Sequence, residues 1–549
     1  MSDSQVEVGA TDSLGGCGHA SRRTNTCACT PFNTRLPPEI QQMIFSWVAV
    51  LDPPSIPGDA KGSLGFVLIS HVCRHWRTTL LSMRHVWADS MGLLPEATIE
   101  MVRRAGSHPL TVTLRSDLSP FDEGMGLFCH RRSTRALHCA LSEPSPSRAR
   151  EYEDVFCDEV HPWPILETLK IEVSDRIIGM DKDSLMPSLR FLTMKNIFNH
   201  FTAPSLQSLS IEFQEWTKGS FALQAFKFFD MVRACRSTLQ DLELTHCFAP
   251  DAMPLIPTPI ELPELRSLYL GGCSHQLLDA ARNCFTYPSA CDISFRPLYD
   301  YTTTNPFQPD ESLHLVLRAF SDEVIACTGS YGFEFHALPG EASHISVRAL
   351  SPEALAGTGD LFVTPPDLGS RKVYFDSDRM RIFHDDIFDA LSYALIPAST
   401  KKANLNLSAL RDVRVLSIVQ AGTEPATGAM RKVLLEMPEL RVLHLRGGTA
   451  DMMRCICPVI SHGRLSVPNL QLLRVSADRP YAPPLDLWQF NRCLRRRAEY
   501  HQAGGRPSPL PCLIVDRNVE FDEGLEAQKA GVERLQEMNC VKKVYWRLI

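Results

Sequence analysis

The sequence holds few groups of residues whose types and spacing could do chemistry. Cys17, His19, Cys27 and Cys29 could serve as metal ligands, but C-x-H and C-x-C spacings match no standard structural zinc pattern. No G-x-G-x-x-G, G-x-x-x-x-G-K-[ST], G-x-S-x-G or H-E-x-x-H string occurs, so the common phosphate-binding loops, nucleophile elbow and zinc-protease helix are absent. We therefore expect no catalytic site, no metal and no cofactor in this chain.

The remaining polar clusters have ordinary structural explanations. The His-Asp-Asp run at 384–386 opens an apolar helical pattern, and acidic residues are common at helix N-termini. Cys455 and Cys457 lack the spacing of a redox pair, so buried thiols are expected there. The arginines at 131–132 and 495–497 have no interleaved aromatic residues, which favours solvated faces over a nucleic-acid site.

Composition narrows the class of protein. The 549 residues are 44% hydrophobic and 22% charged, which is typical of a soluble chain with several domains or one long array of repeats. A net charge of −7 offers no basic field, so we expect neither a nucleic acid nor a membrane as partner. The 18 scattered cysteines fit reduced thiols in the cytoplasm or nucleus. A polar start at 1–20 indicates no secretory signal.

The elements that position any site begin near residue 34. Residues 1–33 are mostly small and polar and bury too little surface to offset the entropy of ordering, so we expect a disordered tail. From Leu36 to Val48 apolar residues recur every four positions behind two prolines, as on one face of a helix. A Pro/Gly loop leads to a second helical pattern over 64–81. Two short amphipathic helices bury little surface alone and are expected to dock on something.

Three strings in this segment carry a family resemblance. LPPEIQQMIFSWV begins at residue 36, ISHVCRHWR at 69 and RHVW at 84. Residues 34–90 resemble an F-box, the helical motif that binds the Skp adaptor of cullin-based ubiquitin ligases. The resemblance implies adaptor contacts at Leu36, Pro37, Pro38, Ile40, Ile44, Val72, Cys73 and Trp76. The alternative is an ordinary helical hairpin that packs into the rest of the chain.

Residues 91–549 contain an internal repeat. Eight copies read PILETLKI at 164, PSLRFLTM at 187, PSLQSLSI at 204, STLQDLEL at 237, PELRSLYL at 263, SALRDVRV at 408, PELRVLHL at 438 and PNLQLLRV at 468. The gap between Leu265 and Leu410 has room for four more strands, for which the candidates are 291–295, 332–335, 344–347 and 372–375. Helical patterns at 229–236, 276–284, 386–395 and 430–436 lie between copies.

A strand and a helix every 20 to 30 residues or so is typical of leucine-rich repeats. The copies that end in Cys247 and Cys273 are similar to the cysteine-containing repeats that often follow F-boxes, where the cysteine is structural. The expected fold class is therefore α/β: a short helical F-box, followed by an irregular leucine-rich-repeat-like solenoid with a parallel concave sheet.

This architecture implies a function in recognition and not catalysis. The chain would hold the Skp adaptor, and through it a cullin, while the solenoid binds an unknown substrate protein. By strand alternation, the residues between the leucines face the concave surface, such as Asp412 and Arg414 in the copy at 408. Phe191, Tyr269 and His444 are the first choices for substrate contacts, because aromatic anchors concentrate binding energy. A scaffold without ligase activity and an enzyme on an unrecognised fold remain the alternatives.

Overall fold

The computed structural model forms two compact units, Met1–Thr113 and Leu114–Ile549. It describes residues 36–55, 63–115, 130–141, 163–174, 178–179, 183–213, 225–247, 258–273, 275–297, 311–337, 343–351, 361–363, 368–375, 410, 412–420, 431, 433–446, 456, 467–476, 487–503, 510–516, 519, 525–537 and 540–547. The expected tail 1–33, the 384–386 cluster and Cys455 and Cys457 lie outside these residues.

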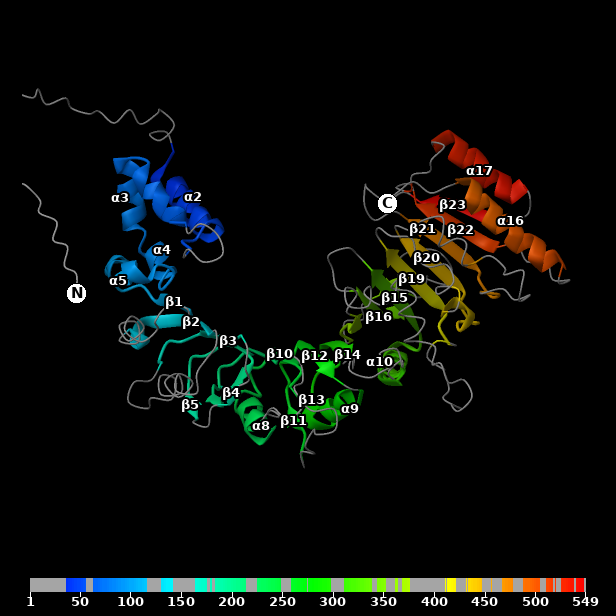
Figure 1. Cartoon of the computed structure of the whole chain (residues 1–549). Helices are drawn as coiled ribbons and strands as arrows, with labels where there is room; N and C mark the ends of the chain where they lie inside the picture. Colours follow the sequence, from blue (N-terminus) through cyan, green and yellow to red (C-terminus); the bar gives the residue numbers. More distant parts are fainter. Residues whose placement is uncertain are drawn as a thin grey trace, which may run out of the picture. The chain divides into compact units, whose positions relative to one another are not determined.

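The first unit is helical (Figure 1). Its elements are α2 (Pro38–Leu51), the 3-10 helix η1 (Gly65–His71), α3 (Arg74–Ser82), α4 (Arg84–Ala88), η2 (Pro95–Ala97), α5 (Thr98–Ala105) and β1 (Leu110–Arg115), which begins in this unit. The expected single helix over 64–81 is divided into η1 and α3. Cys73 is extended, with φ −159° and ψ 168°, and its Sγ accepts a hydrogen bond from the Trp76 backbone N–H, so a new helix starts there.

This unit extends past residue 90, where the sequence analysis ended the F-box-like segment. Trp87 is its centre: the indole is 1% exposed, packs edge-on against Phe66 at 5.5 Å and donates to Leu80 O at 3.0 Å. Arg104 of α5 covers the same indole, with its guanidinium carbon 4.3 Å from the ring centroid. Since α5 completes the packing around Trp87, residues up to Thr113 belong with the helices.

The second unit is a mixed α/β structure with one large, mostly parallel sheet (Figure 1). The strands in spatial order are β2 (Thr134–Leu141), β3 (Thr168–Val173), β6 (Phe191–Lys195), β9 (Ser208–Glu212), β10 (Asp241–Thr245), β12 (Ser267–Cys273), β14 (Asp292–Pro297), β18 (Arg371–Phe375), β16 (Ser343–Leu350), β15 (Tyr331–Ala337), β19 (Val415–Gln420), β20 (Val442–Arg446), β21 (Leu472–Ser476), β22 (Leu510–Asp516) and β23 (Val541–Arg547).

Helices and short strands surround this sheet. The 3-10 helix η3 (Arg131–Ser133) precedes β2, and the helices are α8 (Ala225–Ala234), α9 (His275–Cys284), α10 (Glu311–Thr328), α16 (Leu487–Ala503) and α17 (Leu525–Glu537). The short strands are β4 (Ile178–Gly179), β5 (Ser184–Leu185), β7 (Ile197–Phe198), β8 (Phe201–Thr202), β11 (Ile260–Glu261) and β13 (Phe285–Thr286). A further short strand, β17 (Phe362–Val363), belongs to the large sheet and pairs antiparallel with the end of β16. Within the described chain, no helix is both long enough and apolar enough to cross a membrane.

The repeat copies at 187, 204 and 438 each begin with a tight turn and one buried leucine anchor. In the copy at 187, the Leu189 N–H donates to Met186 O at 3.2 Å, which closes a turn at Pro187 just before β6. Leu189 is fully buried, and the same turn closes on Leu206 and Leu440. Proline fixes the turn and the buried leucine fixes the direction of the strand that follows. The expected strands of these copies are therefore confirmed.

The four strands expected between Leu265 and Leu410 all form, as β14, β15, β16 and β18. Their arrangement differs from four successive parallel repeats. β14 pairs in parallel with β18, β16 lies antiparallel between β18 and β15, and β15 then pairs in parallel with β19. The expectation of a sheet that is parallel throughout and follows chain order is thus wrong here. A strand's own pattern does not specify its neighbour, because pairing is a long-range property.

In the copy at 408, the buried anchor and the strand lie three residues later than the sequence pattern predicts. The register aligns Val415 with Val442 and Ser417 with His444, and the turn closes from Leu410 O to the Val413 N–H. Val413 is therefore the anchor, and the expected face pair Asp412 and Arg414 is replaced by Val415 and Ser417. Leu410 and Val413 are both apolar and lie three residues apart, so the sequence is compatible with either residue as the anchor.

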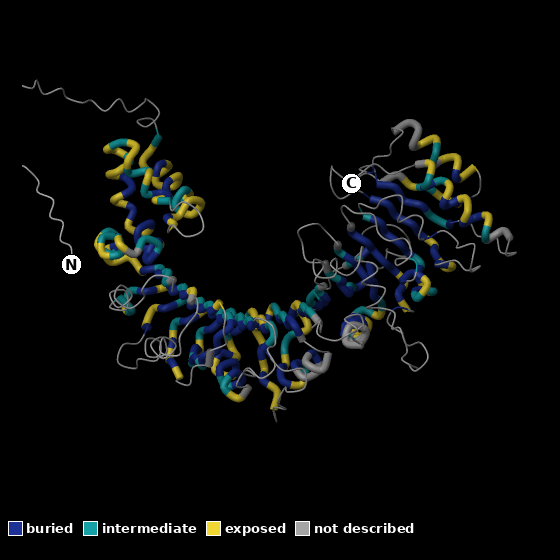
Figure 2. Tube along the Cα trace, viewed as in Figure 1, coloured by how far each residue is buried: buried dark blue, intermediate teal, exposed yellow. Residues whose placement is uncertain are grey.

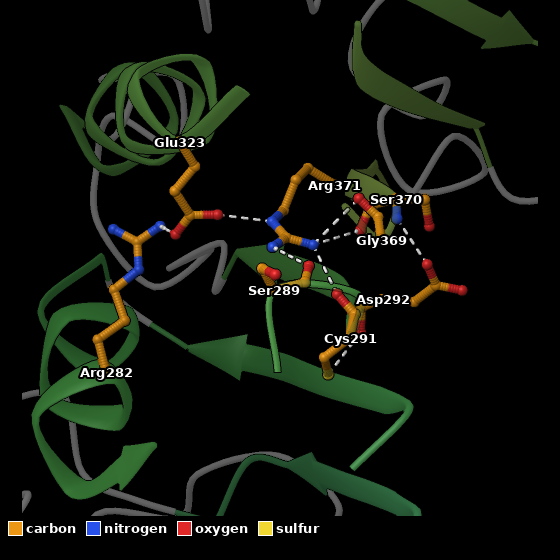
Figure 3. Close-up of polar contacts among 8 residues, drawn as sticks. All are labelled: Arg282, Ser289, Cys291, Asp292, Glu323, Gly369, Ser370 and Arg371. Atoms are coloured by element: carbon orange, nitrogen blue, oxygen red, sulfur yellow. Dashed lines mark hydrogen bonds and ion pairs between the residues drawn. The ribbon is translucent and has the colours of Figure 1, made fainter. Parts of the chain in front are cut away.

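The junction of β14 and β18 is held by a buried arginine (Figure 3). Arg371 is 2% exposed, and its guanidinium donates to Glu323 of α10 at 2.6 Å and to Cys291 O at 2.6 Å. It also donates to the carbonyl oxygens of Ser289, Gly369 and Ser370. A planar group with five donors can satisfy one carboxylate and several carbonyl oxygens at once. Arg371 therefore ties α10 and the residues before β14 to β18.

The sheet has two faces with different chemistry. One face, which we call the helix face, carries buried apolar residues such as Leu242, Leu268 and Val373, and Arg371 reaches α10 from it. The other face alternates with it and carries Tyr269, so we call it the Tyr269 face. From β3 to β10 the alternating residues of this face are intermediate or exposed (Figure 2).

Candidate functional site

An apolar stripe on α2 faces solvent. Ile40, Met43, Ile44, Trp47, Val50 and Leu51 are 38 to 78% exposed, and their spacing of three and four residues places them along one side of the helix. The opposite side of α2 is buried through Gln41 and Phe45. Large apolar side chains that recur on an exposed helix face mark an interaction site more reliably than single exposed residues. We call these six residues the α2 stripe.

A second apolar row accompanies it on η1. Leu64, Leu68 and Val72 are 46, 51 and 57% exposed and lie four residues apart. η1 packs against both α2 and α3, so all three elements form one small helical assembly. The first unit thus leaves apolar surface open on two of its elements.

The structure distributes the expected adaptor residues over this assembly. Ile40, Ile44 and Val72 belong to the exposed rows. Pro37 and Pro38 are exposed at the start of α2, while Leu36, Cys73 and Trp76 are only partly exposed.

Trp76 supports the assembly from inside. Its ring meets Phe45 edge-on at 5.2 Å, and Gln41 links α2 to α3 through His75, with 2.9 Å between Gln41 Oε1 and His75 Nε2. The Gln41 amide also donates to Leu36 O at 3.1 Å, which fixes the entry to α2. Gln41 is therefore a polar residue on the buried side of α2 because its side chain bonds the backbone before the helix and joins α2 to α3. This arrangement holds the stripe outward.

Sequence reasoning missed Trp47, the largest exposed apolar side chain of the stripe, together with Met43, Val50 and Leu51. Trp47 is 61% exposed. The signal was present, because Trp47 follows Ile40 and Ile44 at helical spacing. Spacing alone leaves open which of two apolar sides faces inward, and Phe45 and Val48 offered the competing side.

The Tyr269 face was the expected site for a substrate. Phe191 at the start of β6 is 46% exposed, as expected. Tyr269 is partly exposed; burial raises the pKa of its hydroxyl, and Arg296 makes a hydrogen bond with it. His444 is 7% exposed, so the expectation that it lies open to a partner is wrong.

His444 is buried because the face is covered between β19 and β22. Val415, Val442, Leu472 and Ile514 on this face pack with Leu350, the last residue of β16, and with Leu361, which precedes β17. The residues beside them are polar and paired. His444 Nε2 lies 2.8 Å from Ser476 Oγ, and its Nδ1 lies 3.5 Å from Ser417 Oγ.

An arginine–aspartate ion pair is also buried on this face. Arg474 Nε and Nη2 lie 3.1 and 3.0 Å from Asp516 Oδ2, and Asp516 has no exposed surface. On the helical side, Arg497 is 3% exposed and donates to Val467 O at 2.7 Å. The expectation of a solvated arginine cluster is therefore wrong for Arg497 and holds for Arg495 and Arg496, which are exposed.

Glu334 has three partners, one histidine and two arginines, where the open and covered parts of the face meet. Its carboxylate lies 3.2 Å from His336 Nε2, 2.8 Å from Arg348 Nη1 and 3.3 Å from Arg446 Nη1, and its side chain is 5% exposed. Burial raises the pKa of the carboxyl, but the hydrogen bonds from His336 and Arg348 outweigh it and lower the pKa to about 2. Glu334 is therefore charged at neutral pH.

Most cysteines of the described residues are buried. Cys247 is 1% exposed, and its Sγ lies 3.2 Å from Ile211 O, as expected for a thiol that fills a turn. Cys273 ends β12, and its side chain lies outside the described residues. Burial raises the pKa of Cys139, Cys235 and Cys291 to about 12, so these thiols stay protonated.

The described residues include no group of three or more His, Cys, Asp or Glu side chains that could hold a metal ion. In comparisons with known proteins, no family model matches the chain and no curated protein is similar to it. The apolar rows of the first unit and the Tyr269 face of the second unit are the two candidate binding surfaces.

Proposed function

We propose that this chain is the substrate-recognition subunit of a cullin-RING ubiquitin ligase. The first unit acts as an F-box that binds a Skp-family adaptor. The second unit acts as a leucine-rich-repeat-like solenoid whose Tyr269 face binds a substrate protein. Ubiquitin transfer belongs to other subunits, and this chain supplies proximity by holding the substrate near them.

The observation that carries the proposal is the exposed apolar surface of α2 and η1. It falls within the segment 34–90, whose strings resemble an F-box, and it includes Ile40, Ile44 and Val72 from the implied adaptor contacts. Helix-in-groove recognition needs large apolar anchors at i, i+3, i+4 and i+7, and Ile40, Met43, Ile44 and Trp47 follow that spacing.

The anchors have enough surface left to bury for a stable complex. Full burial of one large apolar side chain contributes about 1.5 to 3 kcal/mol. Each side chain of the α2 stripe has roughly half of its surface exposed, so its burial by a partner contributes on the order of 1 kcal/mol to binding. Tryptophan is enriched among the residues that dominate interfaces. Trp47 is therefore expected to be the leading anchor.

Trp47→Ala should weaken binding of a purified Skp-family adaptor by at least about thirtyfold, since loss of a dominant anchor costs about 2 kcal/mol or more. Isothermal titration calorimetry with the full chain measures the affinity. Trp488→Ala is the matched control, because Trp488 on α16 is also 61% exposed and lies in the second unit. Ile99→Ala is the control within the first unit, since Ile99 of α5 is 86% exposed and outside both apolar rows.

Equal affinity of wild-type and Trp47→Ala chains, or equal loss in Trp488→Ala, would contradict the proposal. Thermal melts of all variants should coincide, because each removed side chain is mostly exposed. The alternative, a scaffold that binds the adaptor without ubiquitylation, has a separate readout. If adaptor and cullin co-purify with the chain while no bound protein changes in abundance on gene deletion, the scaffold replaces the ligase.

A further inference from the structure

Four aromatic rings form a continuous row on the Tyr269 face. The ring centroids of Tyr269 and Tyr374 are 6.2 Å apart, those of Tyr374 and His344 5.1 Å, and those of His344 and His336 4.4 Å. The two histidine rings are stacked at 6°. Tyr374, His344 and His336 are direct cross-strand neighbours in β18, β16 and β15, and Tyr269 in β12 completes the row from across β14. Within β14, Ser294 pairs with Tyr269 and is small enough for the rings to meet above it.

The row remains partly accessible, unlike the covered part of the face that follows it. All four aromatic side chains have intermediate exposure, and His336 is 24% exposed. Partly exposed rings held by neighbouring rings lose little conformational entropy when a partner binds. The row is therefore a pre-organised contact surface.

Charge on the Tyr269 face changes sign near this row. Before it, β10 carries Asp241 and Glu243, while Glu212 of β9 is paired with Lys195 of β6 at 3.1 Å. From β14 to β20, the Tyr269 face carries four cationic side chains and two acidic ones. The cationic residues are Arg296, Lys372, Arg348 and Arg446, and the acidic residues are Asp292 and Glu334. Arg348 and Arg446 hold Glu334, and both keep about a third of their side-chain surface exposed. A local excess of positive charge thus surrounds the aromatic row in a chain whose net charge is −7.

We propose that this aromatic row is the docking site for an acidic segment of the substrate protein, with Asp or Glu side chains toward Lys372 and its neighbouring arginines and with apolar groups on the rings. This inference rests on the proposed function and specifies its substrate class. Complementary charge sets register and excludes wrong partners, and the aromatic rings supply the contact area. Asp241 and Glu243 of β10, the strand beside Tyr269, repel the same segment and so limit where it can lie.

A protein segment fits this surface better than a single-stranded nucleic acid, which also favours aromatic rings and cations. Nucleic-acid grooves track a polyanion with positive charge along their length. Here the positive region is bordered by Asp241 and Glu243 of β10, and the whole chain has a net negative charge. A short acidic stretch followed by neutral residues can lie on such a surface, whereas a continuous polyanion is repelled at one end.

The test selects random decapeptides displayed on phage against the full chain and measures synthetic copies by fluorescence polarisation. Selected peptides should carry net negative charge from Asp and Glu. Lys372→Glu and Tyr374→Ala should each weaken them by at least about tenfold. The matched controls are Lys543→Glu and Tyr545→Ala on β23, where both side chains are exposed at the other end of the same sheet; these should bind as wild type.

The inference would be overturned by the absence of any enriched peptide, by enriched peptides that are neutral or basic, by binding insensitive to Lys372→Glu and Tyr374→Ala, or by tighter binding of a labelled dT10 oligonucleotide than of the peptides. Binding that requires phosphoserine in place of Glu would also overturn it. Adaptor titrations on the same variants separate the two proposals. Adaptor binding without acidic peptides refutes this inference alone, and acidic peptides without adaptor binding refute the ligase role alone.

Discussion

The ion pairs of Glu334 make the free energy of unfolding depend on pH by a calculable amount. The lowered pKa of about 2 against an ordinary value of 4.5 corresponds to about 3 kcal/mol of stability at neutral pH. Because the folded-state pKa is depressed, this stability is present above pH 4.5 and is lost as the pH falls toward 2; about 2 kcal/mol should be gone at pH 3. Glu334→Gln removes the contribution at pH 7 and flattens the dependence below pH 4.5. Arg348 and Arg446 are about one-third exposed, so water can hydrate them and the cost should stay near 3 kcal/mol.

Hydrogen exchange followed by mass spectrometry measures this locally, on peptides that cover β15 and β19, with exchange corrected for intrinsic rates at each pH. The β9 peptide serves as internal reference. Glu243→Gln is the matched control on the same face, because Glu243 is exposed and bonded to Ser210, and it should cost less than about 0.5 kcal/mol. Equal protection of β15 in wild-type and Glu334→Gln chains at pH 7 would refute the reasoning, as would an unchanged dependence between pH 5 and pH 3 in the variant.

Two further predictions concern buried groups of the second unit. Arg371→Ala should destabilise the β14–β18 junction by roughly 3 to 5 kcal/mol, because several buried carbonyl oxygens lose their donor and Glu323 keeps only Arg282; faster hydrogen exchange in β18 checks it, and unchanged exchange would show that the network is dispensable. Cys139, Cys235 and Cys291, with their pKa values raised to about 12, should resist iodoacetamide at pH 8 until urea is added, whereas the half-exposed Cys73 reacts in the native chain. Native labelling of Cys291 as fast as Cys73 would contradict its burial.

Local patterns in the sequence were sufficient to predict most of the strands. A turn-forming proline followed by a leucine anchor is a local device, and it specifies the strand that follows at Leu189 and Leu440. The same holds for α2, whose proline start and apolar spacing are contained in one short segment. These features depend on residues close in sequence.

Features that depend on distant segments could not be predicted. His444 lies at a strand position that alternation assigns to an exposed face, and it is buried because residues around Leu350 and Leu361 cover that face. The antiparallel place of β16 follows from pairing with β15 and β18, which no repeat spacing encodes. Glu334 likewise acquires Arg446 as a partner from a strand 112 positions away.

The pairing of β14 with β18 has a consequence for synthesis on the ribosome. The hydrogen bond from the Ser370 N–H to Asp292 joins residues 78 positions apart, whereas the preceding strands each pair with a strand close behind them in the chain. The sheet up to β14 can form as the chain emerges, but its growing edge then waits for β18. At about 5 to 20 residues per second, that delay lasts roughly 4 to 16 seconds. During it, β14 offers unpaired backbone groups at an open edge, so this is the stage at which a nascent chain most needs protection from pairing with another.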